Sequence, residues 1–416
     1  MGLTIAIVKE TADCEKRVAA TPETVKKYTG LGCKVVVEKG AGAGASIPDS
    51  AFKDAGAQIA ADQEALFKSA DIVLAVQAPD HKAIKKDALV IAMFAPYANE
   101  KLIDELAKAK INAFSMELVP RITRAQSMDV LSSQSNLAGY KSVLDACEYY
   151  GSAFPMMMTA AGTIPPARVL VMGAGVAGLQ AIATARRLGA IVSATDVRPA
   201  AKEQVESLGG KFVAVEDDEF KEAETAGGYA KQMSAAYQKK QQALIEETIP
   251  KQDIVITTAL IPGRPAPKLI TEKMVKSMRP GSVIVDLAVE NGGNCELAKL
   301  GKVVNVDDVN IIGHKNFPSR LASDASALYS RNLMSLLQLI IKDGKLEIDP
   351  EDEIIQGITL TRDGKIVHPN FGGKSAAVKK TATTAKPKAA TAPANDEKTK
   401  TAKKKTATKS KPKKQD

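Results

Sequence analysis

The chain of 416 residues contains no Trp, and aromatic side chains make up 4% of it. This scarcity disfavours lectin-like proteins and proteins that stack nucleic-acid bases on aromatic rings. The three His and four Cys form no HExxH motif, no Ser/His/Asp arrangement and no cysteine cluster, so metal and nucleophilic catalysis are disfavoured. The cysteines are interpreted as reduced thiols of a cytoplasmic protein. They are Cys14, Cys33, Cys147 and Cys295.

Long apolar runs are also missing. Glycines interrupt the longest apolar stretch, Val169 to Ala185, so no segment qualifies as a membrane span. The first ten residues lead directly into a strand pattern, without a basic region or a cleavage site, and secretion is therefore not expected. The length is enough for two or three domains with full cores.

The net charge of +9 is unevenly distributed. Residues 374–416 hold fourteen Lys and three acidic residues, which leaves 43 basic and 45 acidic residues in 1–373. The tail is rich in Lys, Ala, Thr and Pro and lacks apolar periodicity, so it is predicted to be disordered. It is either a solvated extension, which we favour, or a segment that attracts polyanions such as nucleic acid or anionic lipid.

Alternating strand and helix patterns predict an α/β protein with two Rossmann-like doubly wound parallel-sheet domains separated by a cleft. A helix starting near Asn136 is expected to bridge the two domains. A helix over 323–341 is expected to return the chain to the first domain. The expected first domain consists of residues 1–135 and is completed by residues 320–373. The second domain consists of residues 136–319, and residues 374–416 form the tail. Strands of parallel type are expected at 211–215, 254–258, 282–286 and 302–306. The three Met at 156–158 are predicted to pack in the core.

The most specific local motif lies after a buried-type strand at 169–172. Gly173, Gly175 and Gly178 form a GxGxxG pattern that leads into an apolar helix. In such a motif the first glycine allows the tight turn, the second lets the backbone approach a pyrophosphate, and the third lets the helix sit close to the sheet. The free N–H groups at the helix start would hold the pyrophosphate. The pattern predicts a dinucleotide site in the second domain.

The end of the next strand carries Asp196, at the position where a carboxylate accepts both hydroxyls of an adenosine ribose and repels a 2′-phosphate. Arg198 could instead meet a 2′-phosphate. Because Asp196 has the more usual position, NAD(H) is preferred to NADP(H).

Two polar segments are candidates for contact with the reacting end of the nucleotide. Residues 121–136 are dense in Arg, Gln, Asp and Ser; Arg121 and Gln126 could hydrogen-bond a carboxamide and a ribose, and Asp129 could orient either of them. The alternative is a solvated interdomain loop. Residues 216–242 place two glycines beside Tyr229, which suggests a closing lid or an ordinary loop. His81, His314 and His368 do not stand at strand ends in the motif region, and no catalytic role is assigned to them.

Long strings of the sequence resemble the NAD(H)-binding component of the proton-translocating nicotinamide nucleotide transhydrogenases, a family related to alanine dehydrogenase. The resemblance covers residues 1 to about 372. It is carried by KETADCEKRVAATPETV, RITRAQSMDVLSSQSNLAGY, FPMMMTAAGTIPPARVLVMGAGVAGLQAIATARRLGA, ATDVR, KEQVESLGGKF, TAGGYAKQM, TTALIPGRPAP and GSVIVDLAVENGGNC.

The resemblance implies a role for specific residues. The nicotinamide end of NAD(H) would meet Arg121, Ile122, Thr123, Gln126, Asp129 and Ser132. The pyrophosphate would lie along Gly173, Ala174, Gly175, Val176, Ala177 and Gly178, and the adenosine ribose against Asp196, Val197 and Arg198. Gly228 and Tyr229 would belong to a mobile loop over the nucleotide, and Leu260 would pack close to it. Arg121, Gln126, Asp129, Ser132 and Tyr229 are the catalytic candidates, and no metal is implied.

The family passes a hydride from NADH to NADP⁺ on a separate subunit and couples this to proton movement through a membrane-spanning subunit. The resemblance therefore implies NADP(H) as co-substrate, both partner subunits, a homodimer and a place on the inner face of the cell membrane. Alanine dehydrogenases keep an Arg, a Lys and a His around their substrate. Here Arg17 matches the Arg, Gln77 stands at the Lys position, and residues 92–97 have no His.

Three hypotheses fit the sequence. The first is the transhydrogenase component, because hydride transfer between two nicotinamides needs no proton donor. The second is an amino-acid dehydrogenase. The third is a non-enzymatic protein that senses NAD(H) or binds nucleic acid through its tail.

Overall fold

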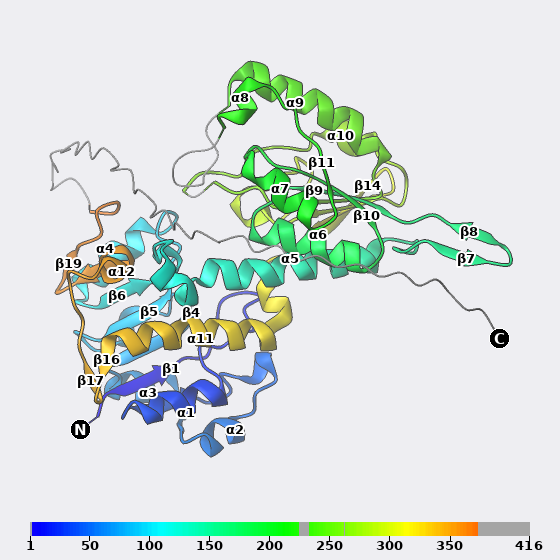
Figure 1. Ribbon diagram of the computed structural model, residues 1–416. Coiled ribbons are helices and arrows are strands. Elements are labelled where there is room, and N and C mark those ends of the chain that lie inside the picture. Colours follow the sequence, from blue (N-terminus) through cyan, green and yellow to red (C-terminus); the bar gives the residue numbers. More distant parts are fainter. Residues whose placement is uncertain (1, 224–232, 262, 373–416) are drawn as a thin grey trace, which may run out of the picture. The chain divides into compact units, whose positions relative to one another are not determined.

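The computed structural model describes residues 2–223, 233–261 and 263–372, and it contains two large β-sheets with helices packed against them (Figure 1). The predicted loop residues Gly228 and Tyr229 and the Lys-rich tail lie outside the described residues. The predicted α/β class with two mainly parallel sheets is confirmed.

The first sheet has the strand order β19-β18-β6-β5-β4-β1-β2-β3. Its strands pair in parallel except β18 and β19, which run antiparallel at one edge. The strands are β1 (Thr4–Ile7), β2 (Lys34–Glu38), β3 (Gln58–Ala60), β4 (Ile72–Gln77), β5 (Leu89–Met93), β6 (Asn112–Ser115), β18 (Thr359–Arg362) and β19 (Lys365–Ile366). The accompanying helices are α1 (Pro22–Gly30), α2 (Asp49–Asp54), α3 (Gln63–Ser69), α4 (Glu100–Lys108), α11 (Ala322–Ile340) and α12 (Glu353–Ile358).

The second sheet has the order β11-β10-β9-β12-β13-β15-β14. Its strands are β9 (Arg168–Met172), β10 (Ile191–Thr195), β11 (Lys211–Phe212), β12 (Ile254–Thr257), β13 (Val283–Asp286), β14 (Lys302–Val306) and β15 (Val309–Gly313). Its helices are α5 (Val130–Tyr149), α6 (Val176–Arg187), α7 (Ala200–Ser207), α8 (Asp218–Lys221), α9 (Ala235–Thr248) and α10 (Glu272–Lys276). Two small hairpins are separate from the sheets: β7 (Met157–Thr159) with β8 (Gly162–Ile164), and β16 (Ile341–Lys342) with β17 (Lys345–Leu346).

Both sheets are buried on their two faces, as continuous apolar strands require. In β1, Ile5 and Ile7 join a core with α1, α2 and α11, while Ala6 belongs to a core with α3 and α4. In β9, Val169 and Val171 pack with α5 and α6, and Leu170 packs with α9 and α10. Alternate side chains of one strand therefore supply two cores, which defines a doubly wound sheet.

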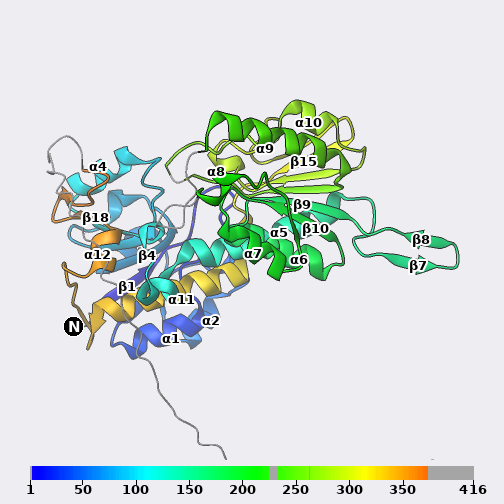
Figure 2. The ribbon, with the colours of Figure 1, turned by 45° about the horizontal axis from the view of Figure 1, so that its top comes forward.

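Helix α5 begins at Val130 rather than near Asn136, where the sequence pattern places it. The carboxylate of Asp129 caps this helix by accepting the N–H of Ser132 at 2.9 Å. Residues 132–136, interpreted as part of a polar loop, are helical because tertiary contacts use their side chains. Figure 2 shows α5 lying beside α11, and the two helices are in contact.

Two expectations about strands and packing are wrong. Residues 302–306 form a strand, but it pairs antiparallel with β15, which the sequence analysis does not identify. Met156, Met157 and Met158 do not pack in the core: they lead into the β7–β8 hairpin and are 59%, 41% and 78% exposed. The ribbon shows this hairpin projecting away from both sheets (Figure 1).

A carboxylate just after β1 makes stability depend on pH. Glu10 accepts hydrogen bonds from the backbone N–H groups of Val76, at 2.6 Å, and Gln77, at 3.2 Å. Burial raises the pKa of Glu10 to about 7, and the negative charge of Glu15 acts in the same direction. Between pH 4.5 and 7 the unfolded chain therefore loses this proton while the folded chain keeps it, and folding becomes less favourable as the pH rises.

Urea unfolding at pH 5 and pH 8 should show this effect. The folded protein is expected to lose about 3 kcal/mol through Glu10 over that range, since a pKa difference of one between the folded and unfolded states corresponds to about 1.4 kcal/mol. Glu10→Gln should remove this contribution to the pH dependence, whereas Glu64→Gln, at an exposed ion pair with Lys68, should leave it unchanged. Equal pH profiles for the wild type and Glu10→Gln would refute the assignment.

Candidate dinucleotide site

The glycine motif forms a tight turn between β9 and α6. Gly173 has φ +103°, a conformation that other residues rarely adopt. A Cβ atom on Gly178 would lie 1.8 Å from the carbonyl oxygen of Gly173, so the helix start approaches the turn too closely for any side chain there. Around Gly175, by contrast, an added Cβ would meet nothing within 4 Å. The turn therefore has a packed side and an open side.

The N-terminus of α6 borders this open side. Its N-cap is Gly175, which has no side chain to accept the first N–H groups of the helix, and Val176 is 41% exposed. Ala177 follows on the first turn of the helix. Unpaired N–H groups and the positive end of the helix dipole make such a terminus suited to an anionic group. The geometry fits a pyrophosphate.

Asp196 lies beside this turn because β9 and β10 are paired in parallel, with Met172 opposite Thr195. Its carboxylate accepts the N–H of Ala174 at 2.7 Å. The same carboxylate accepts the N–H of Arg198 and two N–H groups of the Arg198 guanidinium, each at 2.9 Å. Val197 lies between them. The predicted ribose residues and the glycine turn are thus joined through one carboxylate.

The other side of the turn is held by residues that the sequence analysis missed. Thr258, directly after β12, donates its hydroxyl to the carbonyl of Gly173 at 3.0 Å. Asn294 accepts the N–H of Ala259 at 3.0 Å and donates to its carbonyl at 2.8 Å. These bonds support the loop carrying Leu260, which is 51% exposed. The position of Thr258 at the carboxyl end of β12, which is paired with β9, is the signal that could have identified it.

The polar segment before α5 forms a 3₁₀ turn, η4 (Thr123–Met128). Arg121, Thr123 and Gln126 are exposed, and Ile122 packs partly against the first core. The sequence suggests that Asp129 orients Arg121 or Gln126. In the structure its carboxylate accepts two hydrogen bonds from Ser132, one from the backbone N–H and one from the hydroxyl at 2.5 Å.

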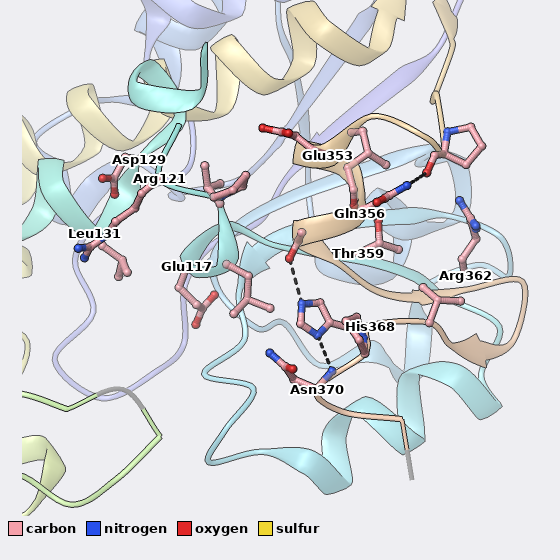
Figure 3. Close-up of a pocket in the computed structure, with 18 of the residues that line it drawn as sticks. Glu117, Arg121, Asp129, Leu131, Glu353, Gln356, Thr359, Arg362, His368 and Asn370 are labelled. Carbon is pink, nitrogen blue, oxygen red and sulfur yellow. Dashed lines mark hydrogen bonds between the residues drawn. The ribbon is translucent and has the colours of Figure 1, made fainter. Parts of the chain in front are cut away.

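A groove of about 920 Å³ opens next to this segment, and Figure 3 shows the side chains that line it. Arg121, Asp129 and Leu131 lie on one side of it, and residues of α12 and the following strands on the other. Because the groove reaches Arg121 and Asp129, a second molecule can approach them from solvent.

His368 also lines this groove, but both of its ring nitrogens are engaged. Nε2 donates to the carbonyl of Gly357 at 3.1 Å, and Nδ1 accepts the N–H of Asn370 at 3.2 Å (Figure 3). Burial lowers the pKa of His368, which keeps the ring neutral at pH 7. The geometry therefore explains His368 as a structural residue.

Helix α5 connects the polar segment with the glycine turn. Asp129 caps its first turn, and ten residues later Gly139 packs on the first turn of α6. A Cβ atom on Gly139 would lie 2.0 Å from the carbonyl oxygen of Ala177, so the two helices touch backbone to backbone. One helix thus relates the predicted nicotinamide residues to the predicted pyrophosphate residues.

A doubly wound sheet with a glycine turn, an uncapped helix N-terminus and a carboxylate on the neighbouring strand has the features of dinucleotide-binding α/β proteins. The chain belongs to the alanine dehydrogenase/PNT family: residues 6–138 match the model of its N-terminal domain and residues 142–369 that of its C-terminal domain.

Among its relatives are transhydrogenases. The chain is 56% identical over 382 residues to a Rhodospirillum rubrum protein named as the first part of NAD(P) transhydrogenase subunit alpha, covering 89% of this chain and 100% of the relative. It is 48% identical over 372 residues to NAD(P) transhydrogenase subunit alpha of Haemophilus influenzae, and the match covers 88% of this chain and 72% of the relative. The crystal structure of transhydrogenase from Sinorhizobium meliloti is similar, with a TM-score of 0.80 and 54% identity, and the match covers 88% of this chain and 100% of that structure's chain. The predictions of a transhydrogenase alpha subunit, and of an enzyme subunit, are confirmed.

Among residues 2–223, 233–261 and 263–372, no helix is both long and apolar enough to cross a bilayer. The same residues contain no group of three or more His, Cys, Asp or Glu placed to hold a metal ion.

Proposed function

We propose that residues 1–373 bind NAD(H) along the glycine turn and present the nicotinamide for direct hydride transfer to NADP⁺ carried by a partner subunit. The observation that carries this proposal is the hydrogen bond from the N–H of Ala174 to the carboxylate of Asp196, because it brings the carboxylate proposed to bind the ribose beside the open side of the glycine turn. Relatives called NAD(P) transhydrogenase, matched over most of the chain, support the reaction.

Bound NADH supplies a hydride from its C4 atom, and NADP⁺ accepts it at C4, so that NAD⁺ and NADPH form without a proton donor. The protein then has to orient the ring and keep the two C4 atoms close, and well-oriented reactants can gain several orders of magnitude in rate. Arg121 and Gln126 would hold the carboxamide and the ribose, and Asp129 with Ser132 would fix the backbone from which they project. Ile122 and Thr123 complete this segment, and Leu260 would cover the cofactor from the second sheet.

The structure also disfavours amino-acid dehydrogenation. The guanidinium of Arg17, which matches a substrate-binding Arg of alanine dehydrogenases, makes two hydrogen bonds to Glu15, at 2.8 and 2.6 Å. Gln77 likewise donates to Glu15 at 3.0 Å instead of offering a cation. A keto acid would therefore meet a guanidinium that is already neutralised by Glu15, and an amide in place of a cation at position 77.

The Rhodospirillum rubrum relative is named as one portion of a subunit alpha, which implies further transhydrogenase subunits. We propose that this chain works with a membrane-spanning subunit and an NADP(H)-binding subunit, at the cytoplasmic face of the cell membrane. A contact of the Lys-rich tail with polyanions remains a secondary hypothesis.

Mixing the purified chain with a partner's NADP(H)-binding domain tests the proposal. Reduction of an NAD⁺ analogue by NADPH should be fast, and deletion of residues 374–416 should leave both NADH binding and transfer unchanged. No turnover in a folded mixture would count against the proposal. NADH oxidation that depends on pyruvate and ammonia would instead support the amino-acid dehydrogenase, and NADH binding without transfer would support a sensor.

We further propose that the chain forms a homodimer in which the β7–β8 hairpin packs on the second copy. An isolated two-stranded ribbon is marginally stable in water, and this one exposes Met157, Met158 and Ile164. Met158→Glu should shift the protein toward monomer in sedimentation velocity, because it places a charge in an apolar contact. Leu300→Glu, at another exposed apolar residue, is the control. An unchanged sedimentation coefficient for Met158→Glu would exclude this contact.

A further inference from the structure

A buried polar network lies next to residues 121–129, the segment proposed to contact the nicotinamide and called here the nicotinamide segment. Contacts with the cofactor do not explain this network. Arg17 is 2% exposed and forms an ion pair with Glu15, whose side chain is fully buried. Burial disfavours the charge of Glu15, but hydrogen bonds from Arg17, Gln77 and Asn316 outweigh it and lower the pKa to about 2. The carboxylate of Glu15 is therefore ionised at neutral pH.

The network continues from this ion pair into α5. Arg17 donates from Nη1 to Oε1 of Gln134 at 2.8 Å. Gln134 is buried, and its Nε2 donates to the carbonyl of Ala325 on α11 at 3.2 Å. The first two turns of α5 are thus tied to both the N-terminal segment and α11.

From α5 the network reaches the nicotinamide segment through Asn332 of α11, which is 7% exposed. Ser133 donates its hydroxyl to Oδ1 of Asn332 at 2.7 Å, and Asn332 donates from Nδ2 to the carbonyl of Ser127 at 2.8 Å. A carbonyl can only accept, so the Ser127 contact determines which end of the amide is the nitrogen. Ser127 follows Gln126 and precedes Asp129 by two residues.

We propose that Asn332, with Ser133, is a positioning residue for hydride transfer: it holds the η4 turn against α5 so that Gln126 and Asp129 keep their place. This inference rests on the proposed function. The contact is specific because it joins three segments, α5, α11 and η4, through one buried amide. Loss of its donor removes this hydrogen bond from the carbonyl of Ser127, and an oxygen in place of the amide nitrogen would repel that carbonyl, so the turn would shift.

The decisive variant is Asn332→Asp, which keeps the shape of the side chain but turns an oxygen toward the carbonyl of Ser127. A displacement of about 1 Å in a reacting group can reduce a rate by about 100-fold. We therefore expect kcat for transfer to fall about 10- to 100-fold, while the dissociation constant for NADH and the KM for the partner domain change less than about 3-fold. The fluorescence of bound NADH should change as well, since it reports the surroundings of the nicotinamide ring.

Asn305→Asp is the matched control, because Asn305 also donates a side-chain hydrogen bond, at 3.0 Å to Asn310, but lies on β14. Ser133→Ala removes the other contact of Asn332. If both residues act through one connection, the double variant Ser133→Ala/Asn332→Asp should be no slower than the slower single variant. The milder Asn332→Ser replaces Asn332→Asp if the latter does not fold.

The inference is overturned if folded Asn332→Asp keeps wild-type kcat and wild-type NADH fluorescence, or if kcat falls only in proportion to the unfolded fraction. It is also overturned if the two single effects add fully in the double variant. Absence of transfer in the wild-type mixture would refute the proposed function instead, and the fluorescence of bound NADH would still decide the role of Asn332.

Discussion

NADH affinity is expected to fall about 100-fold or more when Asp196 is replaced by alanine. The proposed contacts are hydrogen bonds from two ribose hydroxyls to a carboxylate, each worth about 1.5–3 kcal/mol, and about 1.4 kcal/mol corresponds to a factor of ten. The substitution also removes the bond to the N–H of Ala174, which shapes the glycine turn. Isothermal titration calorimetry with NADH measures the change.

The same variant reports on the choice between the two coenzymes. In the wild type, Asp196 occupies the guanidinium of Arg198 with two hydrogen bonds. Without the carboxylate, the repulsion of a 2′-phosphate disappears, so the preference for NADH over NADPH should narrow.

Asp62→Ala is the control for Asp196→Ala, since Asp62 caps α3 with an exposed carboxylate far from the glycine turn in the sequence. It should cost some stability and leave NADH affinity unchanged. Wild-type affinity in folded Asp196→Ala would remove the basis of the proposed site.

The second large effect concerns the glycines of the turn, where two substitutions of the same kind should behave differently. Gly178→Ala would place Cβ 1.8 Å from the carbonyl oxygen of Gly173, and because this neighbour is backbone, the start of α6 has to move. We expect a loss of about 1–3 kcal/mol of stability, as for other overpacked positions, together with loss of NADH binding. Gly175→Ala meets no atom within 4 Å and should fold with wild-type stability.

NADH binding by Gly175→Ala should nevertheless weaken by at least about tenfold, because its methyl group would take the space proposed for the pyrophosphate. Thermal unfolding and NADH titration of both variants separate packing from ligand approach. Gly151→Ala, which also has open space around its Cβ but lies after α5, is the control. If Gly175→Ala bound NADH like the wild type, the pyrophosphate would have to lie elsewhere.

Much of the fold could be predicted because local patterns specify it. The strand at 302–306 has the expected bounds, and α11 begins one residue before the expected helix. The position of Asp196 beside the glycine turn also follows from local information, since two parallel strands joined by one helix bring their carboxyl ends together. Apolar periodicity and glycine spacing are properties of neighbouring residues and can be recognised in the sequence.

The errors arose where the outcome depends on distant partners. The direction of β14 is set by its pairing with β15 through a turn at Asp307 and Asp308, both with positive φ, and apolar content does not encode direction. Three consecutive Met are compatible with a core or with a projecting hairpin. The Ser-rich start of α5 has weak helix propensity, and Asp129, Gln134 and Asn332 compensate for it through a cap and buried hydrogen bonds.

The amino-acid sequence by itself determined that this protein is built of α/β units, that it carries a glycine turn followed by an acidic strand end, and that it resembles the transhydrogenases. These features depend on residues close together in the chain. Only the tertiary structure decided that Arg17 is neutralised by Glu15, that Asn332 holds the segment with Gln126 and Asp129, and that the groove beside Arg121 is open. The physical reason is that hydrogen bonds and close packing between α5, α11 and the turns depend on three-dimensional distances, which residue spacing along the chain does not specify.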